Sequence, residues 1–162
     1  MKNSNKNNQK NSSKDKNHDE IKFKAEKLAL GRMNLRKILN ITEKEIRGSA
    51  SLALLLALHG KNKDARILLD GLKALEPKCG YLHSIEAQME FIRNNKENCR
   101  NILTVSREFK NIDNTMRLKR AEMLRRLQHP TAMQLELEFI NENKLTPDLH
   151  KTLQTLQKAA EK

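Results

Sequence analysis

The segment LALHGKNKDARILLDGLKALEP, from Leu56 to Pro77, predicts two helices joined by a tight turn. Gly60 breaks the first helix, because glycine is a poor helix former and a common turn residue. The residues from Asn62 to Leu75 form the return helix, in which apolar side chains recur every three or four positions before Pro77 closes it. The fold depends on whether this helical hairpin occurs once or is repeated along the chain.

A repeat spacing of about 34 residues relates this hairpin to two later segments. Steps of this length connect small residues on the expected first helices and leucines on the expected second helices: Ala53, Ala87 and Ala121, and Leu69, Leu103 and Leu137. Small residues let the two helices of a hairpin approach closely, while larger residues fill the space to the next hairpin. We therefore expect three copies, at about residues 46–79, 80–113 and 114–147. The alternative is a helical bundle in which this spacing arises by chance.

The first copy resembles the tetratricopeptide-repeat (TPR) family. The residues that carry the resemblance are Leu52 and Ala53 for the Leu-Gly pair, Gly60 for the turn glycine, Ala65 and Leu69 for the Ala-x3-Phe element, and the closing Pro77. The later copies are degenerate, since Asn94 replaces the turn glycine and Asn111 replaces the proline. The resemblance implies an all-α solenoid of three helical hairpins, with a flanking helix at each end.

The rest of the chain completes this organisation. Residues 1–19 are rich in Asn and Lys and nearly lack apolar side chains, so we expect a disordered tail. A helix is expected in residues 20–41, the three repeats in 42–147 and a capping helix in 148–162. Thr42 is a candidate N-cap, with Glu45 three residues later completing a capping box. The later helices are expected at about Tyr81–Arg93, Lys96–Phe109, Asn114–Leu127 and Pro130–Glu142, with a last one beginning at Thr146 and Pro147.

Composition narrows the function classes. Of the 162 residues, 37% are apolar and 3% are aromatic, with no Trp, which disfavours a large aromatic ligand pocket. The two cysteines, Cys79 and Cys99, are too few for a disulfide framework or a zinc site, and we expect both to be reduced against helix faces. Since no apolar run has the form of a signal peptide or the length of a membrane span, we expect a cytoplasmic protein.

The sequence contains no recognisable catalytic motif. The five histidines are scattered without metal-ligand spacing, and there is no glycine-rich phosphate loop or nucleophile elbow. We therefore predict a protein that is not an enzyme and that holds no metal or cofactor. The acidic residues of RILLD (66–70) and LELEF (135–139) alternate with apolar ones and are expected on exposed helix faces.

The formal net charge of +12 raises the question of nucleic acid or an acidic partner. The strongest basic cluster, RLKRAEMLRRLQ at 117–128, spreads around its helix instead of forming one stripe, so we expect a solvated face. No aromatic residue interleaves with the cluster to stack bases. We expect the charge to serve solubility and an acidic partner, and a basic helical nucleic-acid-binding protein is the alternative function.

Glu86 and Arg120 stand one repeat spacing apart, at the place that Leu52 holds in the first copy. A lone charge on a helix-packing face is costly. Two interpretations remain open. Either the two side chains form an ion pair across the interface of the second and third repeats, or the register slips and both face solvent.

The first helices of such repeats line a concave groove that holds an extended or helical peptide. Mapped from the family, the groove positions are Leu54, Ala57, Tyr81, Gln88, Phe91, Leu118, Glu122 and Arg125. The expected function is binding of a protein client, as a chaperone or adaptor, and a homodimer is compatible with it. The layout of residues 21–160 resembles that of small bacterial type III secretion chaperones, although their Tyr- and Phe-rich repeats are absent. That resemblance implies a secreted translocator or needle subunit as the client.

Overall fold

The computed structural model describes residue 23 and residues 35–160. The chain divides into two compact units, residues 1–42 and 43–162, and each is described by itself. In the first unit the described residues include the short helix α2 (Leu35–Ile38). The expected disordered tail at 1–19 and most of the expected helix at 20–41 therefore lie outside the described residues.

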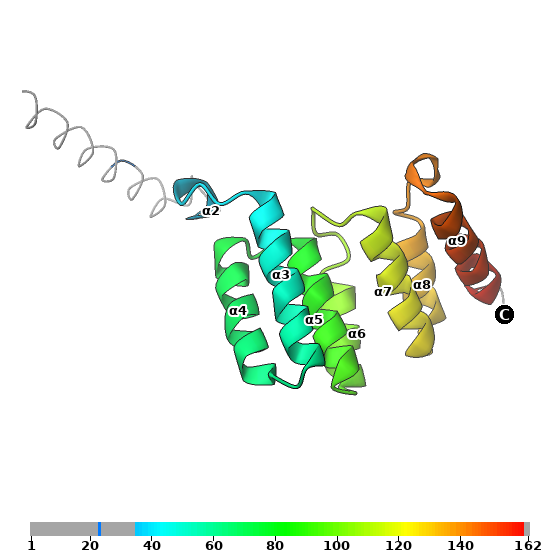
Figure 1. The fold of residues 1–162 in the computed structure, drawn as a ribbon. Helices are drawn as coiled ribbons and strands as arrows, with labels where there is room; N and C mark the ends of the chain where they lie inside the picture. Colours follow the sequence, from blue (N-terminus) through cyan, green and yellow to red (C-terminus); the bar gives the residue numbers. More distant parts are fainter. Residues whose placement is uncertain (1–22, 24–34, 161–162) are drawn as a thin grey trace, which may run out of the picture. The chain divides into compact units, whose positions relative to one another are not determined.

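In the described part of the second unit, residues 43–160, helices joined by short loops make up the regular secondary structure (Figure 1). Its elements are α3 (Glu43–Leu58), α4 (Asn62–Leu75), α5 (Gly80–Ile92), α6 (Lys96–Val105), α7 (Asn114–Arg126), α8 (Pro130–Leu137), the 3-10 turn η1 (Glu142–Lys144) and α9 (Pro147–Ala160). Helices α3–α4, α5–α6 and α7–α8 form three hairpins; α5 lies beside both α3 and α7, and α9 packs on α7 and α8. The all-α prediction is confirmed for the described residues, whose only β-type pairing is an isolated bridge between Cys79 and Lys110.

The same left-handed turn ends the first helix of each hairpin. Gly60, Asn94 and Gln128 have φ angles of 77°, 59° and 57°, and they follow one another at the repeat spacing. At each turn this residue's amide donates to the carbonyl three residues earlier, and the next amide donates to the carbonyl five residues before itself. Asparagine and glutamine thus take the place of glycine in the later copies. The backbone strain of this turn is smaller for asparagine than for glutamine, because asparagine tolerates positive φ better than most residues.

The core of this unit uses the positions that recur at the repeat spacing. Those that are fully or almost fully buried are Ala53, Ala87, Ala121, Ala65, Cys99, Met133, Leu69 and Leu103. Leu137 is only half-buried. Leu55 is exposed, unlike its equivalents Met89 and Met123, because α3 is the first helix of the unit and no hairpin precedes it there.

Helix α6 ends earlier than the sequence predicts, at Val105 instead of Phe109. The Ser106 hydroxyl donates a hydrogen bond to the Ile102 carbonyl in the last turn of the helix, and Arg120 of α7 donates to the Leu103 carbonyl at 2.7 Å. A side chain from another helix therefore satisfies a carbonyl at the end of α6. Local helix propensity cannot predict such a contact.

Helix α8 also ends early, at Leu137 instead of Glu142. Asn114 of α7 and Asn141 exchange two hydrogen bonds, of 2.7 and 3.2 Å, that hold the loop after α8. The chain leaves the helix because this tertiary contact satisfies the backbone of the loop.

Glu86 and Arg120 are both buried, but they do not pair with each other. Glu86 of α5 binds Arg66 and Lys73 of α4, at 3.1 and 2.6 Å. Arg120 of α7 binds Glu136 of α8 at 2.6 Å. Both sequence interpretations are therefore wrong. The long side chains reach the second helices of the hairpins, where opposite charges offset the cost of burial.

Candidate functional site

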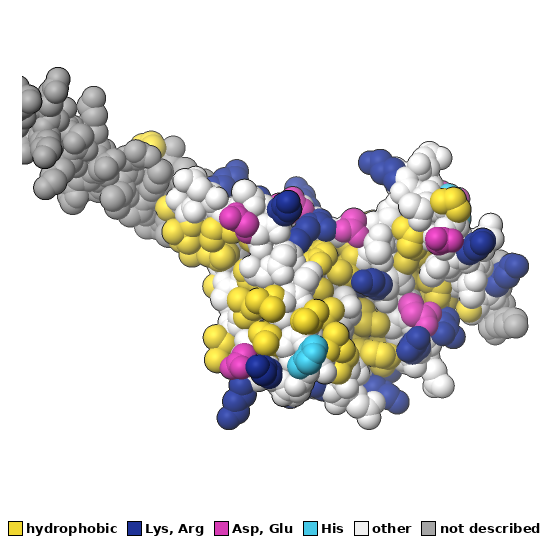
Figure 2. All heavy atoms as spheres, in the orientation of Figure 1, with side chains coloured by type: hydrophobic (Ala, Val, Ile, Leu, Met, Phe, Trp, Pro, Cys, Tyr) yellow, Lys and Arg dark blue, Asp and Glu magenta, His cyan; other side chains and the backbone are white. Residues whose placement is uncertain are grey.

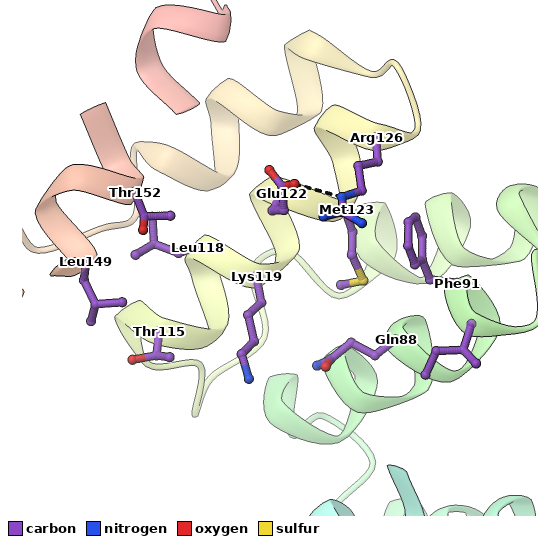
Figure 3. A pocket seen from close by; sticks show the side chains of 11 residues that line it. Gln88, Phe91, Thr115, Leu118, Lys119, Glu122, Met123, Arg126, Leu149 and Thr152 are labelled. Atoms are coloured by element: carbon purple, nitrogen blue, oxygen red, sulfur yellow. Dashed lines mark hydrogen bonds and ion pairs between the residues drawn. The ribbon is translucent and has the colours of Figure 1, made fainter. Parts of the chain in front are cut away.

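An open hollow of about 380 Å³ lies between α5, α7 and α9 (Figure 3). Its lining residues are Gln88, Phe91 and Ile92 of α5, Thr115, Leu118, Lys119, Glu122, Met123 and Arg126 of α7, and Leu149 and Thr152 of α9. The volume is near the lower end of the range of about 300–1,000 Å³ that ligand pockets span. The first helices of two neighbouring hairpins and the last helix thus share one concave surface.

Helix α7 contributes most of this lining from a single face. Its six lining residues form two rows separated by single helical turns: Thr115, Lys119 and Met123, and Leu118, Glu122 and Arg126. Ala121 and Leu124 lie on the other side of α7 from these two rows and are buried in the core. Leu118 and Met123 of the lining belong to the same buried cluster, so the face of α7 that borders the hollow also contributes to the core.

The wall of the hollow is mostly apolar. Leu118 and Met123 are 3% and 6% exposed, and the half-buried side chains of Phe91 and Leu149 line the hollow from α5 and α9. Ile92, 44% exposed, also belongs to the lining. Figure 3 shows the side chains of Phe91, Leu118, Met123 and Leu149 on three different helices around one space. Apolar surface that remains in contact with water favours an occupant that covers it.

The edge of the hollow carries one tightly held carboxylate. Glu122 accepts hydrogen bonds from Arg125 Nε and Nη2, at 2.8 and 2.9 Å, and from Arg126 Nε at 2.8 Å. The bonds from Arg125 lower the pKa of Glu122 most, and together with those from Arg126 they outweigh burial and hold it at about 2. Glu122 is therefore ionised and already neutralised by its own helix.

Four of the eight residues predicted for the groove line this hollow: Gln88, Phe91, Leu118 and Glu122. Arg125 is not part of the lining but binds Glu122, which is. Tyr81 lies elsewhere on α5, with the Arg47 guanidinium 4.7 Å from its ring centre and the Ser51 hydroxyl 3.3 Å from its own.

The predicted groove residues of α3 do not line the hollow. Leu54 is half-buried and Ala57 is 4% exposed. Exposed apolar side chains on this helix are instead Leu52, Leu55 and Leu58, which are 53–59% exposed. In Figure 2 hydrophobic side chains gather over α3 and α5. The apolar surface of the first hairpin thus differs from the one that the family's pattern predicts.

Seven of the eleven lining residues were not predicted from the sequence: Ile92 of α5, Thr115, Lys119, Met123 and Arg126 of α7, and Leu149 and Thr152 of α9. The one-turn spacing of the α7 residues was a usable signal, because it places them on one helix face. On α9, Leu153 and Leu156 are buried in the core whereas Leu149 lines the hollow. Amphipathic spacing predicts that such leucines are buried, but it does not identify the one that lies at the edge of a groove.

A second group of charged side chains is buried between α7 and α8. Glu136, 1% exposed, binds Arg120 Nε and Nη2 at 3.0 and 2.6 Å and Arg117 Nη1 at 2.8 Å. Arg120, fully buried, also donates to the Ser84 and Ser106 hydroxyls, both at 3.0 Å. The expectation that the 117–128 cluster and the acids of LELEF are solvated is wrong for Arg117, Arg120 and Glu136. One carboxylate thus serves as the counter-charge for two arginines inside the protein and ties α8 to α7.

The described residues contain no candidate metal site, and their two cysteines are unpaired thiols. Among them, no group of three or more His, Cys, Asp or Glu side chains could hold a metal ion. Cys79 and Cys99 are free and buried, and burial raises the pKa of the Cys99 thiol to about 11. Within the same residues, no helix combines the length and apolarity needed to cross a bilayer.

Comparisons with known proteins find no relative of the chain. No protein-family model matches it, and searches of curated proteins and of solved structures find no significant match either. The shape and chemistry of the hollow are therefore the basis on which a function can be proposed.

Proposed function

We propose that the chain is a protein-binding module without catalysis, a chaperone or adaptor that holds a peptide or helix of a client in the hollow. The observation that carries the proposal is an open, mostly apolar wall built by three separate helices. Such a wall gains free energy when apolar side chains of a client cover it. Grooves between helices bind amphipathic segments in this way, with one apolar face turned inward.

The arrangement of the hairpins supports a TPR-like solenoid. Three helix pairs follow one another, their first helices are neighbours, and a turn of positive φ recurs at the repeat spacing. In this proposal α9 caps the array through Leu153 and Leu156, and the hollow belongs to the concave face. The weak resemblance to type III secretion chaperones then suggests a secreted translocator or needle subunit as the client and the cytoplasm as the place of action.

The pairing of the basic residues on α7 favours a protein client over nucleic acid. Arg117 and Arg120 bind Glu136 in the interior. Arg125 and Arg126 bind Glu122 at the surface. Cations that are already paired with carboxylates would have to give up those partners to neutralise phosphates, so this helix is a poor electrostatic match for a nucleic-acid backbone.

A charge-neutral change at the hollow tests the proposal. The chain is used to capture a partner from a lysate of the cells that express it, the partner is identified, and its affinity is measured by calorimetry. Ile92→Gln, at the hollow, is compared with Ile67→Gln on α4, a 73% exposed isoleucine outside it. Loss of apolar contact of about 1–2 kcal/mol should weaken binding about five- to thirtyfold for Ile92→Gln only.

Two results would contradict the proposal. One is equal affinity of Ile92→Gln and the wild-type chain for a partner that binds specifically. The other is capture of nothing but the chain itself under conditions shown to retain weak complexes. Melting temperatures of both variants serve as the control, since two exposed isoleucines should differ little in their effect on folding.

A further inference from the structure

We infer that the segment held in the hollow is acidic as well as apolar, and that one of its carboxylates pairs with Lys119. This inference rests on the proposed function and states the chemistry of the client. The five basic residues of α7 between 117 and 126 differ in their partners. Arg117 and Arg120 bind Glu136, and Arg125 and Arg126 bind Glu122.

Lys119 is the fifth of these residues and the exception. It is exposed, and within the described part of the chain no carboxylate lies at ion-pair distance from its ammonium group. The one carboxylate in the lining, Glu122, is fully engaged by two arginines. A cation at the edge of an apolar hollow that is unpaired among the described residues complements an anionic group on the occupant.

The position of Lys119 links this charge to the apolar wall. It lies one helical turn from Met123 and next to Leu118 along α7, and Figure 3 shows its side chain between Thr115 and Gln88. A carboxylate that reaches Lys119 therefore brings the neighbouring side chains of the same segment over the apolar lining. An amphipathic segment with an acidic residue beside its large apolar residues meets both requirements at once.

The same charges select against other occupants. A basic segment would place like charges beside Lys119 at the hollow. A second copy of this chain, with a formal net charge of +12, would meet general electrostatic repulsion as well. Among amphipathic segments of equal apolar content, the acidic one is thus the electrostatic match.

Two designed peptides test the inference on the full chain. Both are short amphipathic helices with leucine at the same positions, and one carries glutamate and the other lysine on the polar face. Fluorescence anisotropy gives their affinities at about 0.15 M salt, and a short DNA duplex serves as a third probe. The acidic peptide should bind about tenfold more tightly than the basic one, and the difference should shrink as salt is added.

Charge reversal at Lys119 gives the decisive comparison. Lys119→Glu should weaken the acidic peptide about fivefold or more and strengthen the basic one. Lys151→Glu on α9 changes the net charge equally at an exposed site outside the lining, and it should leave the order of the peptides unchanged. Ile92→Gln should weaken both peptides.

The outcomes separate the two proposals. If both peptides bind equally and only Ile92→Gln weakens them, the acidic preference is refuted and the apolar groove stands. If Lys119→Glu and Lys151→Glu reduce acidic binding equally, the attraction comes from net charge, and the inference fails. If the DNA duplex binds more tightly than micromolar and neither peptide binds, both proposals fail in favour of nucleic acid.

Discussion

Replacing Glu136 by Gln removes one charge from the most deeply buried ion-pair network of the described residues while keeping the size of the side chain. Glu136 is 1% exposed and accepts three hydrogen bonds of 2.6–3.0 Å from the guanidinium groups of Arg117 and Arg120. Burial lowers the pKa of Arg120, whereas the bonds to Glu136 raise it. The neutral amide leaves two buried cations facing each other without their counter-charge.

The expected loss of stability follows from this geometry. Breaking a buried ion pair by removing one partner costs about 3–5 kcal/mol, because the remaining charge stays desolvated. The free energy of unfolding of a natural domain is about 5–15 kcal/mol, so Glu136→Gln should remove a large part of it. The hydrogen bonds from Arg120 to Ser84 and Ser106 remain in the variant. We therefore expect a loss of unfolding free energy at the lower end of this range, about 3 kcal/mol.

Urea denaturation followed by circular dichroism measures this loss. Glu138→Gln is the matched control, since Glu138 lies two residues further on and is exposed; its effect should stay within about 0.5 kcal/mol. The double variant Arg120→Met/Glu136→Leu should be more stable than Glu136→Gln, because it leaves one buried cation, Arg117, without a counter-charge instead of two. A loss below about 1 kcal/mol for Glu136→Gln would refute the view that the network is buried and interdependent.

Three further predictions concern other parts of the second unit. Burial raises the pKa of Glu86, but hydrogen bonds from His83 and Lys73 outweigh burial and lower the pKa from 4.5 to about 2. The stability that this carboxylate contributes is therefore present above pH 4.5 and lost between pH 4.5 and 2. Glu86→Gln should flatten that part of the curve of unfolding free energy against pH. Gly80→Ala should lower the melting temperature, because the added Cβ would collide with Ile112 and lie 2.9 Å from the Lys110 carbonyl oxygen. Gly71→Ala should instead raise the free energy of unfolding by about 0.5–1 kcal/mol, because Gly71 lies inside α4 with open space around it. Cys99 should not react with a thiol reagent in the native chain at pH 8, because its buried thiol has a pKa of about 11; fast modification before unfolding would contradict its burial.

Features that depend on neighbours along the chain could be predicted from the sequence. The first residues of α3, α4, α7, α8 and α9 match or nearly match the predicted ones, because capping residues and the periodicity of apolar side chains act within one or two turns. The repeat spacing also locates the turns, since Asn94 and Gln128 adopt the left-handed conformation of Gly60. Burial of alanines such as Ala87 follows from the same period, because close helix contacts require small side chains.

The packing of whole helices determines which charged side chains pair and where the hollow lies. Short-range sequence patterns do not predict this packing. Glu86 and Arg120 occupy equivalent positions, yet one binds α4 and the other α8, because the partners within reach of a long side chain depend on how the helices pack. The same packing ends α6 early and places Leu149 of α9 at the hollow. Arg117 and Arg120 meet Glu136 because α7 packs on α8, which no spacing along the chain reveals. The pairs of Glu122 with Arg125 and Arg126, by contrast, follow from their spacing of three and four residues on one helix.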